Sequence, residues 1–171
     1  MEMRAVFALL AAVSALGAYS TADSSKTFIV EAIKEDNAAI LLGELAARQA
    51  ADPNIRAFGT DLAAEHTKRR LEATIVALHL KVSIPRNPTA EAAGEYRKLS
   101  KLPGMAFGDE FIAYMLSAQH KELERFQQAA QNRNRPEACE FAQDALETLQ
   151  QELDRTETLK ATTVAVASAT K

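Results

Sequence analysis

Apolar residues recur at every third or fourth position along four long stretches of the chain, which is the spacing of one face of an α-helix. These stretches cover about residues 25–51, 53–80, 108–133 and 137–160. In the last stretch the steps of three and four continue without a break, through Cys139, Ala142, Leu146, Leu149, Leu153 and Thr156. The pattern therefore predicts four helices of roughly 20 to 30 residues, each with one face turned toward a common core.

Prolines separate the predicted helices. Asp52 and Pro53 favour a helix start, because aspartate caps free backbone N–H groups and proline suits the first helical position. Two prolines in residues 82–89 (VSIPRNPT) exclude a helix there, and a short helix is predicted over 90–100. The predicted fold class is all-α: an up-down four-helix bundle with a long connection between the second and third helices, which carries the short extra helix.

The first residues have the pattern of a secretory signal. Arg4 precedes an uncharged apolar segment from Ala5 to Ala18. The small residues at 18–20 and at 20–22 each suit signal peptidase, and cleavage after Ala22 is favoured. The apolar segment has 14 residues, and a membrane-spanning helix needs about 20. We therefore predict a signal peptide over 1–22, a bundle domain over 23–160 and a disordered tail over 161–171. The mature protein is expected in the periplasm or outside the cell, with no transmembrane span after cleavage.

Composition narrows the class of partner. The net charge is −3 at pH 7, so the chain has no general basic field that would attract nucleic acid.

Single residues support further predictions. The only cysteine of the sequence, Cys139, excludes an intrachain disulfide framework. Because it lies on the apolar stripe of the last helix, it is predicted to be a buried small residue. The basic run Lys68–Arg70 is interpreted as a solvated helix face. Gly43 and Gly59 flank the first turn at similar distances, which predicts close packing of the first two helices.

Candidate chemistry is restricted to the middle of the bundle. The chain has three histidines, and His79, near a helix end, is interpreted as a surface residue. His66 and His120 follow apolar residues at helical spacing, so both are expected to face inward, and Glu152 has a similar position on the last helix. Counting residues from the turns places all three near mid-helix. We therefore expect His66, His120 and Glu152 to converge in the core.

Two interpretations of this cluster stay open. Two imidazoles and a carboxylate are a reasonable ligand set for a single divalent ion such as zinc. Alternatively, the histidines form hydrogen bonds with carboxylates such as Glu152, Asp36 or Glu35 in a buried polar network, and no cofactor is needed. A di-iron oxidase of the ferritin type is not expected, because no histidine has a glutamate three residues before it. The sequence contains no other motif that identifies an enzyme.

Three segments resemble the domain-of-unknown-function 4142 family: residues 28–47 (FIVEAIKEDNAAILLGELAA), 58–66 (FGTDLAAEH) and 99–120 (LSKLPGMAFGDEFIAYMLSAQH). The resemblance covers about residues 26–159, and its most specific parts are the Glu65–His66 pair, the Gly104–Tyr114 stretch with Asp109, and His120. It implies an exported bacterial protein with a ferritin-like four-helix bundle, of a kind often labelled an outer-membrane or membrane protein.

Two departures from the family pattern affect the expected site. The family usually has glutamate where this chain has Ala39, and histidine where this chain has Glu152. The ligand candidate on the first helix is therefore missing and the one on the last helix is changed. The resemblance supports fold and export more than function, and we expect a periplasmic binding or structural module without established catalysis, with a role in envelope stress as a hypothesis. The alternatives are metal binding through His66, His120 and Glu152, and carriage of an apolar ligand or lipid between the helices. Association with the envelope or outer membrane, and a homo-oligomer, also stay open.

Overall fold

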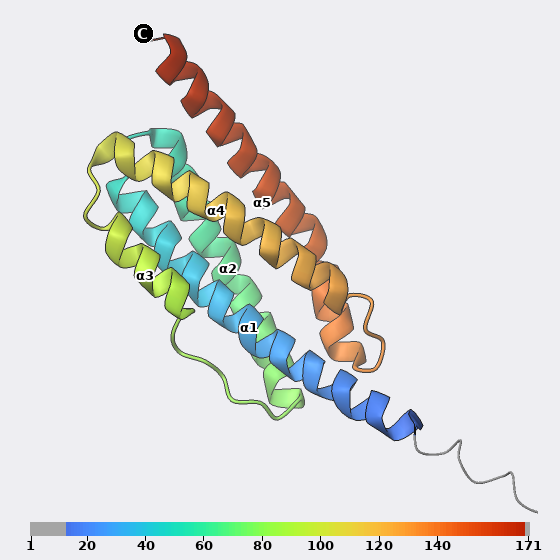
Figure 1. Ribbon diagram of the computed structural model, residues 1–171. Helices are drawn as coiled ribbons and strands as arrows, with labels where there is room; N and C mark the ends of the chain where they lie inside the picture. The colour runs from blue at the N-terminus through green and yellow to red at the C-terminus, as the bar shows by residue number, and fades with distance from the viewer. Residues whose placement is uncertain (1–12, 170–171) are drawn as a thin grey trace, which may run out of the picture.

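The computed structural model of the protein describes residues 13–169, with side chains described from residue 24 to residue 163. These residues form helices joined by turns and loops, and the described part of the chain contains no strand. The helices are α1 (Val13–Gln49), α2 (Pro53–His79), α3 (Ala90–Leu99), α4 (Gly104–Ala129) and α5 (Pro136–Ala169) (Figure 1). The prediction of an all-α protein with four long helices and one short helix is confirmed.

Local sequence sets the helix starts as predicted. The Asp52 side chain accepts a hydrogen bond from the backbone N–H of Asn54, and Pro53 occupies the first turn of α2. Thr89 caps α3 in the same way, through the backbone N–H of Ala92. Each cap satisfies a backbone donor that has no partner within the helix, which is worth about 1 kcal/mol.

Three helix ends differ from the expected positions. α1 begins at Val13, so part of the predicted signal peptide is helical, while residues 1–12 lie outside the described residues; cleavage after Ala22 stays a prediction. α4 begins at Gly104, before the expected start near residue 108. α5 continues to Ala169, past the point where the disordered tail was predicted to begin. There the Thr162 and Thr163 hydroxyls donate to backbone carbonyls one turn earlier, which satisfies these polar groups within the helix.

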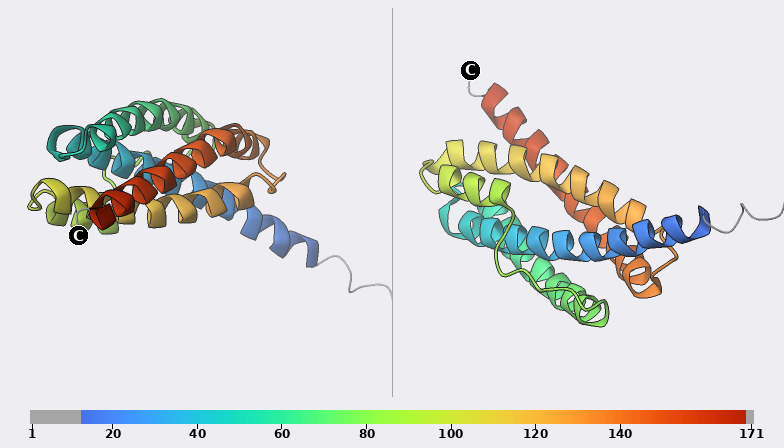
Figure 2. Two further views of the ribbon diagram at one scale, coloured as in Figure 1. Left: turned by 90° about the horizontal axis from the view of Figure 1, so that it is seen from above. Right: turned by 60° about the horizontal axis from the view of Figure 1, so that its bottom comes forward.

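The long helices form two antiparallel pairs. α1 packs along α2 and α4 along α5, and the pairs meet through α1–α4 and α2–α5 contacts (Figure 2). The connection after α2 returns along the bundle beside α1: the Asn37 side-chain amide donates to the carbonyls of Pro85 and Asn87, and the Gln49 amide donates to those of Leu99 and Leu102. Consequently α4 starts at the end where α2 starts, and these two helices run in the same direction (Figure 1).

Gly43 and Gly59 lie at the crossing of α1 and α2, as predicted. A Cβ atom built on Gly43 would lie 2.6 Å from the carbonyl oxygen of Gly59, and one built on Gly59 would lie 2.6 Å from that of Gly43. Because backbone atoms occupy the space, no larger side chain fits without separating the helices.

The core has two apolar halves with a layer of buried polar side chains between them. One half contains the contacting rings of Phe28, Phe126 and Phe141 near the α4–α5 turn, and the other contains Phe58, Phe107 and Phe111 near the α1–α2 turn. The polar side chains between the halves are those of Asp36, His66, Arg69, Gln119, Glu122, Glu152 and Thr156.

Among the helices that the structure describes, none has the length and apolar character needed to cross a membrane.

Candidate functional site

Five ionisable side chains from the four long helices meet in the middle of the bundle, and we call them the charge layer. α1 contributes Asp36, α2 contributes His66 and Arg69, α4 contributes Glu122 and α5 contributes Glu152. Each residue is at most 6% exposed. Charged side chains are buried to this extent only when they have partners, so the contacts within the layer decide its chemistry.

His66 bridges two carboxylates. Its Nδ1 lies 2.9 Å from Asp36 Oδ1, and its Nε2 lies 3.1 Å from Glu152 Oε2. Burial and the nearby Arg69 lower the pKa of His66, but the carboxylates of Glu152 and Asp36 outweigh them and raise it to about 9. The imidazole is therefore protonated at neutral pH, and both ring nitrogens donate to a carboxylate. The approach of Arg69 Nη2 to Nδ1 is then a contact between two donors and not a hydrogen bond.

Arg69 lies at the centre of the layer. Its Nε donates to Asp36 Oδ1 across 2.9 Å, and its Nη2 donates to Glu122 Oε1 across 2.5 Å. The same Nη2 lies 2.6 Å from Nδ1 of His66, and the guanidinium carbon lies 5.4 Å from the centre of the Phe126 ring. The guanidinium is thus the positive charge that joins carboxylates from α1 and α4.

The carboxylates of the layer differ in their environment. Burial raises the pKa of Glu122, although the positive charges of Arg69 and His66 oppose this shift. Burial also acts to raise the pKa of Glu152, but His66 outweighs it and holds that pKa below its usual value. Next to the layer, burial and the charge of Glu122 raise the pKa of Glu35 to about 7, although Arg125 forms an ion pair with it. Negative charge in this region is therefore only partly compensated.

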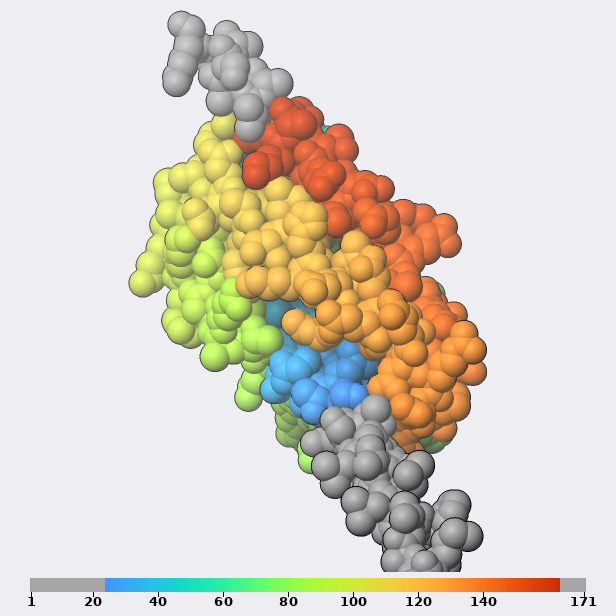
Figure 3. All heavy atoms as spheres, turned by 45° about the vertical axis from the view of Figure 1, so that its right-hand side comes forward, coloured from blue at the N-terminus to red at the C-terminus, as the bar shows by residue number. Residues whose placement is uncertain are grey.

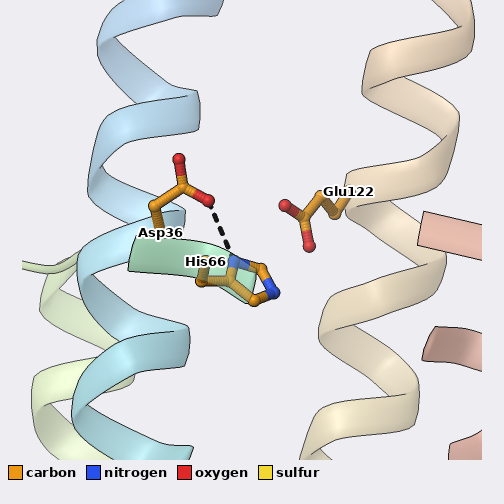
Figure 4. A group of neighbouring side chains, drawn as sticks. All are labelled: Asp36, His66 and Glu122. Carbon is orange, nitrogen blue, oxygen red and sulfur yellow. Dashed lines mark hydrogen bonds and ion pairs between the residues drawn. The ribbon is translucent and has the colours of Figure 1, made fainter. Parts of the chain in front are cut away.

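Three groups of the layer have the chemistry of metal ligands. One ligand atom from each of Asp36, His66 and Glu122 lies within 4.8 Å of the other two (Figure 4). An imidazole nitrogen with carboxylate oxygens is a common donor set for divalent transition metals. The same groups also contact Arg69, so an ion and the guanidinium would compete for them.

The structure brings together part of the predicted site. His66 and Glu152 are in contact, and Asp36 is a hydrogen-bond partner of His66, as predicted. Glu65 is exposed beside the layer, and burial together with the nearby Glu152 carboxylate raises its pKa. Asp109 is exposed near the start of α4 and does not join the layer.

The expectation that His120 faces inward is wrong, because His120 is exposed on α4. The apolar positions used for this prediction were Leu116 and Leu123, and Leu116 is only partly buried. The buried face of α4 instead passes through Phe111, Met115, Gln119, Glu122 and Phe126. Two polar residues occupy this face, so a pattern based on apolar positions does not detect it. The ligand set His66, His120 and Glu152 is therefore not assembled.

Arg69 and Glu122 belong to the layer although the sequence pattern does not single them out. The run Lys68–Arg70 is not the solvated face expected, because only Lys68 is exposed: Arg69 is buried, and Arg70 is half-buried and donates to the Asn37 side chain. One signal in the sequence points to Arg69: it lies three residues after His66 and therefore on the same helix face.

Cys139 is buried and His79 is exposed, as predicted.

Small cavities lie at the edges of the bundle. One of about 90 Å³ lies between α1, the start of α3 and α4, and Glu35, Glu91 and Glu122 are among the residues that line it. Figure 3 shows this face of the molecule, where α1 is visible between α3 and α4. Glu122 therefore belongs to the charge layer and also lines a cavity.

Comparison with known proteins identifies the family. The family model DUF4142, described as a domain of unknown function, matches residues 11–159. No curated protein and no solved structure matches the chain. The matched range includes all five residues of the charge layer and the whole of α2, α3 and α4. The chain belongs to the DUF4142 family.

Proposed function

We propose that this protein is an exported helical-bundle module of the bacterial cell envelope, with a binding or structural role rather than a catalytic one. The support for export is the sequence pattern at the start of the chain: Arg4, the apolar segment 5–18 and the small residues up to Ala22. The long return of the chain between α2 and α4 favours a ferritin-like bundle, since such bundles have one long crossover.

The single observation that carries the non-catalytic role is the pairing inside the charge layer. A general acid or base must approach a substrate to within hydrogen-bond distance. In this protein His66 and Arg69 instead contact the carboxylates of other helices, and they are 1% and 6% exposed. Their hydrogen-bonding groups therefore contact side chains of the bundle itself.

The layer aligns the four helices in this role. Asp36, Arg69, Glu122 and Glu152 come from four different helices, and His66 and Arg69 connect them. A shift of one helix by a single turn, about 5.4 Å, would move a charge into an apolar half of the core. Leaving one buried charge without its partner costs about 3–5 kcal/mol. The layer therefore favours one helix alignment over its alternatives.

Export is tested by expressing the untagged chain in a bacterial host, fractionating the cells and measuring the intact mass. We expect the periplasmic fraction to contain a chain that begins at Asp23. The control is Ala22→Leu, which replaces the small residue at the cleavage site and should leave longer chains. A full-length wild-type chain that stays in the cytoplasm would contradict the proposal.

The role in the envelope is tested separately, by deleting the gene in its own host. We expect slower growth under envelope stress, and restoration of growth by a plasmid copy of the wild-type gene. Unchanged growth of the deletion strain under such stress would count against an envelope-stress role.

A further inference from the structure

We propose that the charge layer also binds one divalent first-row transition-metal ion between Asp36, His66 and Glu122, in competition with Arg69. This site goes beyond the role proposed above, because the bundle would then carry a specific ligand in its core. Ligand geometry, the formal charge of the layer and an unpartnered buried oxygen support the site.

The ligand geometry needs only small movements. The three ligand atoms, one each from α1, α2 and α4, lie within 4.8 Å of one another. Metal–ligand distances of about 2.1 Å in a tetrahedral site separate ligand atoms by about 3.4 Å. Side-chain rotations that move each atom by roughly 1 Å would therefore close the site. Figure 4 shows the carboxylate of Glu122 directed toward His66 from the opposite helix.

The formal charge of the layer matches a divalent ion. A ligating imidazole is neutral, so the ion must displace the proton of His66 into solvent. Asp36, Glu122 and Glu152 then contribute −3 and Arg69 contributes +1 to the layer. The sum is −2, which one divalent ion cancels. A buried layer with a net charge of zero avoids most of the cost of burying an uncompensated charge.

Asp36 provides an independent indication of a ligand. Its Oδ1 contacts His66 and Arg69, but its Oδ2 has no hydrogen-bond partner among the described residues. The residue is 0% exposed. A buried carboxylate oxygen without a partner is costly. Figure 4 draws this oxygen on the side away from His66 and Glu122, so a rotation of the carboxylate would let an ion between these residues satisfy it.

Arg69 determines how readily the ion binds. Its Nη2 lies 2.5 Å from Glu122 Oε1 and 2.6 Å from His66 Nδ1, so it contacts two of the three ligands. The long side chain must withdraw from Glu122 when an ion enters. Glu122 also lines the cavity of about 90 Å³, together with Glu35 and Glu91, so this cavity reaches one of the three ligands.

The test is titration of the untagged, chelator-treated protein with Zn²⁺ and Mn²⁺, followed by calorimetry and elemental analysis. We expect one ion per chain, and affinity for Ca²⁺ and Mg²⁺ lower by about 100-fold, because these ions prefer oxygen ligands alone. His66→Gln and Glu122→Gln should each weaken binding by about 100-fold or more. Arg69→Met removes the competing cation and should strengthen binding by about tenfold.

His120→Ala is the matched control, since it removes an exposed imidazole from the same bundle and should leave the affinity unchanged. X-ray absorption of the zinc-loaded wild type gives a measurement that does not depend on folding of the variants; the outer-shell scattering of one imidazole ring is expected. A wild type that binds no stoichiometric ion, loss of binding in His120→Ala, or a spectrum without imidazole scattering would each overturn this inference. None of these results would affect the proposal of export, and retention in the cytoplasm would not affect this one.

Discussion

Arg69 on α2 donates to Glu122 on α4 across 2.5 Å, although these two helices lie on a diagonal of the bundle. α2 packs beside α1 and α5, and α4 packs beside α5 and α1, so the ion pair crosses the centre of the core. Within the charge layer it links α4 to α2, where His66 and Arg69 contact Asp36 and Glu152. Arg69 is therefore the residue whose loss should affect the fold most directly.

We expect Arg69→Met to lower the free energy of unfolding of the metal-free protein by about 3–5 kcal/mol, because buried carboxylates lose their counter-charge. Urea denaturation of the chelator-treated protein measures this difference. Lys68→Met makes the same chemical change at the neighbouring exposed position and should change stability by less than about 0.5 kcal/mol. Equal effects of the two substitutions would show that Arg69 has no special role.

Stability should fall as the pH rises across the titration of His66. The pKa of His66 rises from its ordinary value of 6.5 to about 9 on folding. Its contribution is fully present below pH 6.5 and is lost as the pH passes through about 9, and it amounts to roughly 3 kcal/mol. Urea denaturation of the metal-free protein at a series of pH values measures the decline.

His66→Gln should remove most of this dependence between pH 6.5 and about 9, whereas His120→Ala should retain it. Glu35, whose pKa of about 7 is also raised, contributes a decline mainly at lower pH, between 4.5 and 7. A wild-type stability that does not change above pH 7 would contradict the charged state assigned to His66.

Gly59→Ala should destabilise the bundle. The added Cβ would lie 2.6 Å from the Gly43 carbonyl oxygen and 2.9 Å from the Ala47 backbone nitrogen, so α1 and α2 would have to separate. Overpacking of this kind costs about 1–3 kcal/mol, which exceeds the gain of up to about 1 kcal/mol from better helix propensity. Thermal unfolding gives the sign of the net effect.

The matched control for this substitution is Gly94→Ala in α3, where the nearest atom to the added Cβ is Arg97 Nη2 at 3.8 Å. This variant has the gain in helix propensity without a clash, so its melting temperature should rise. A rise for Gly59→Ala as well would mean that the α1–α2 crossing is looser than described.

The fold was largely predictable because its signals are local. Asp52, Pro53 and the two prolines of residues 82–89 act within one helical turn, and each marks a boundary that the structure confirms. The close crossing at Gly43 and Gly59 followed from counting residues on each side of one turn. The return of the chain was predicted only as a long connection. Its path depends on hydrogen bonds from Asn37 and Gln49, about 50 residues away in sequence.

The candidate site was only partly predictable. His66 and Glu152 were predicted because both lie in line with apolar neighbours, and Asp36 was named beside Glu35 as one of the carboxylates that could bond to a histidine. Glu122 was missed because it lies on a buried face that also carries Gln119, where polar residues interrupt the apolar pattern. A single residue of error in the phase of α4 was enough to place His120 inside the bundle. Burial of charge depends on partners from other helices, and one helix read alone does not contain that information.

The side-chain amides of Asn37 and Gln49 restrict the length of the segment between α2 and α4. Asn37 binds the backbone at Pro85 and Asn87, while Gln49, more than three turns along α1, binds it at Leu99 and Leu102. Residues 85–102 are therefore attached at both ends to a rigid helix that they do not directly follow. Removing residues between the two attachment points would detach one of them, and adding residues would force a bulge. The distance between the two attachment points on α1 therefore fixes the length of residues 85–102. Changes in the length of this segment should be tolerated less well than changes in an ordinary surface loop.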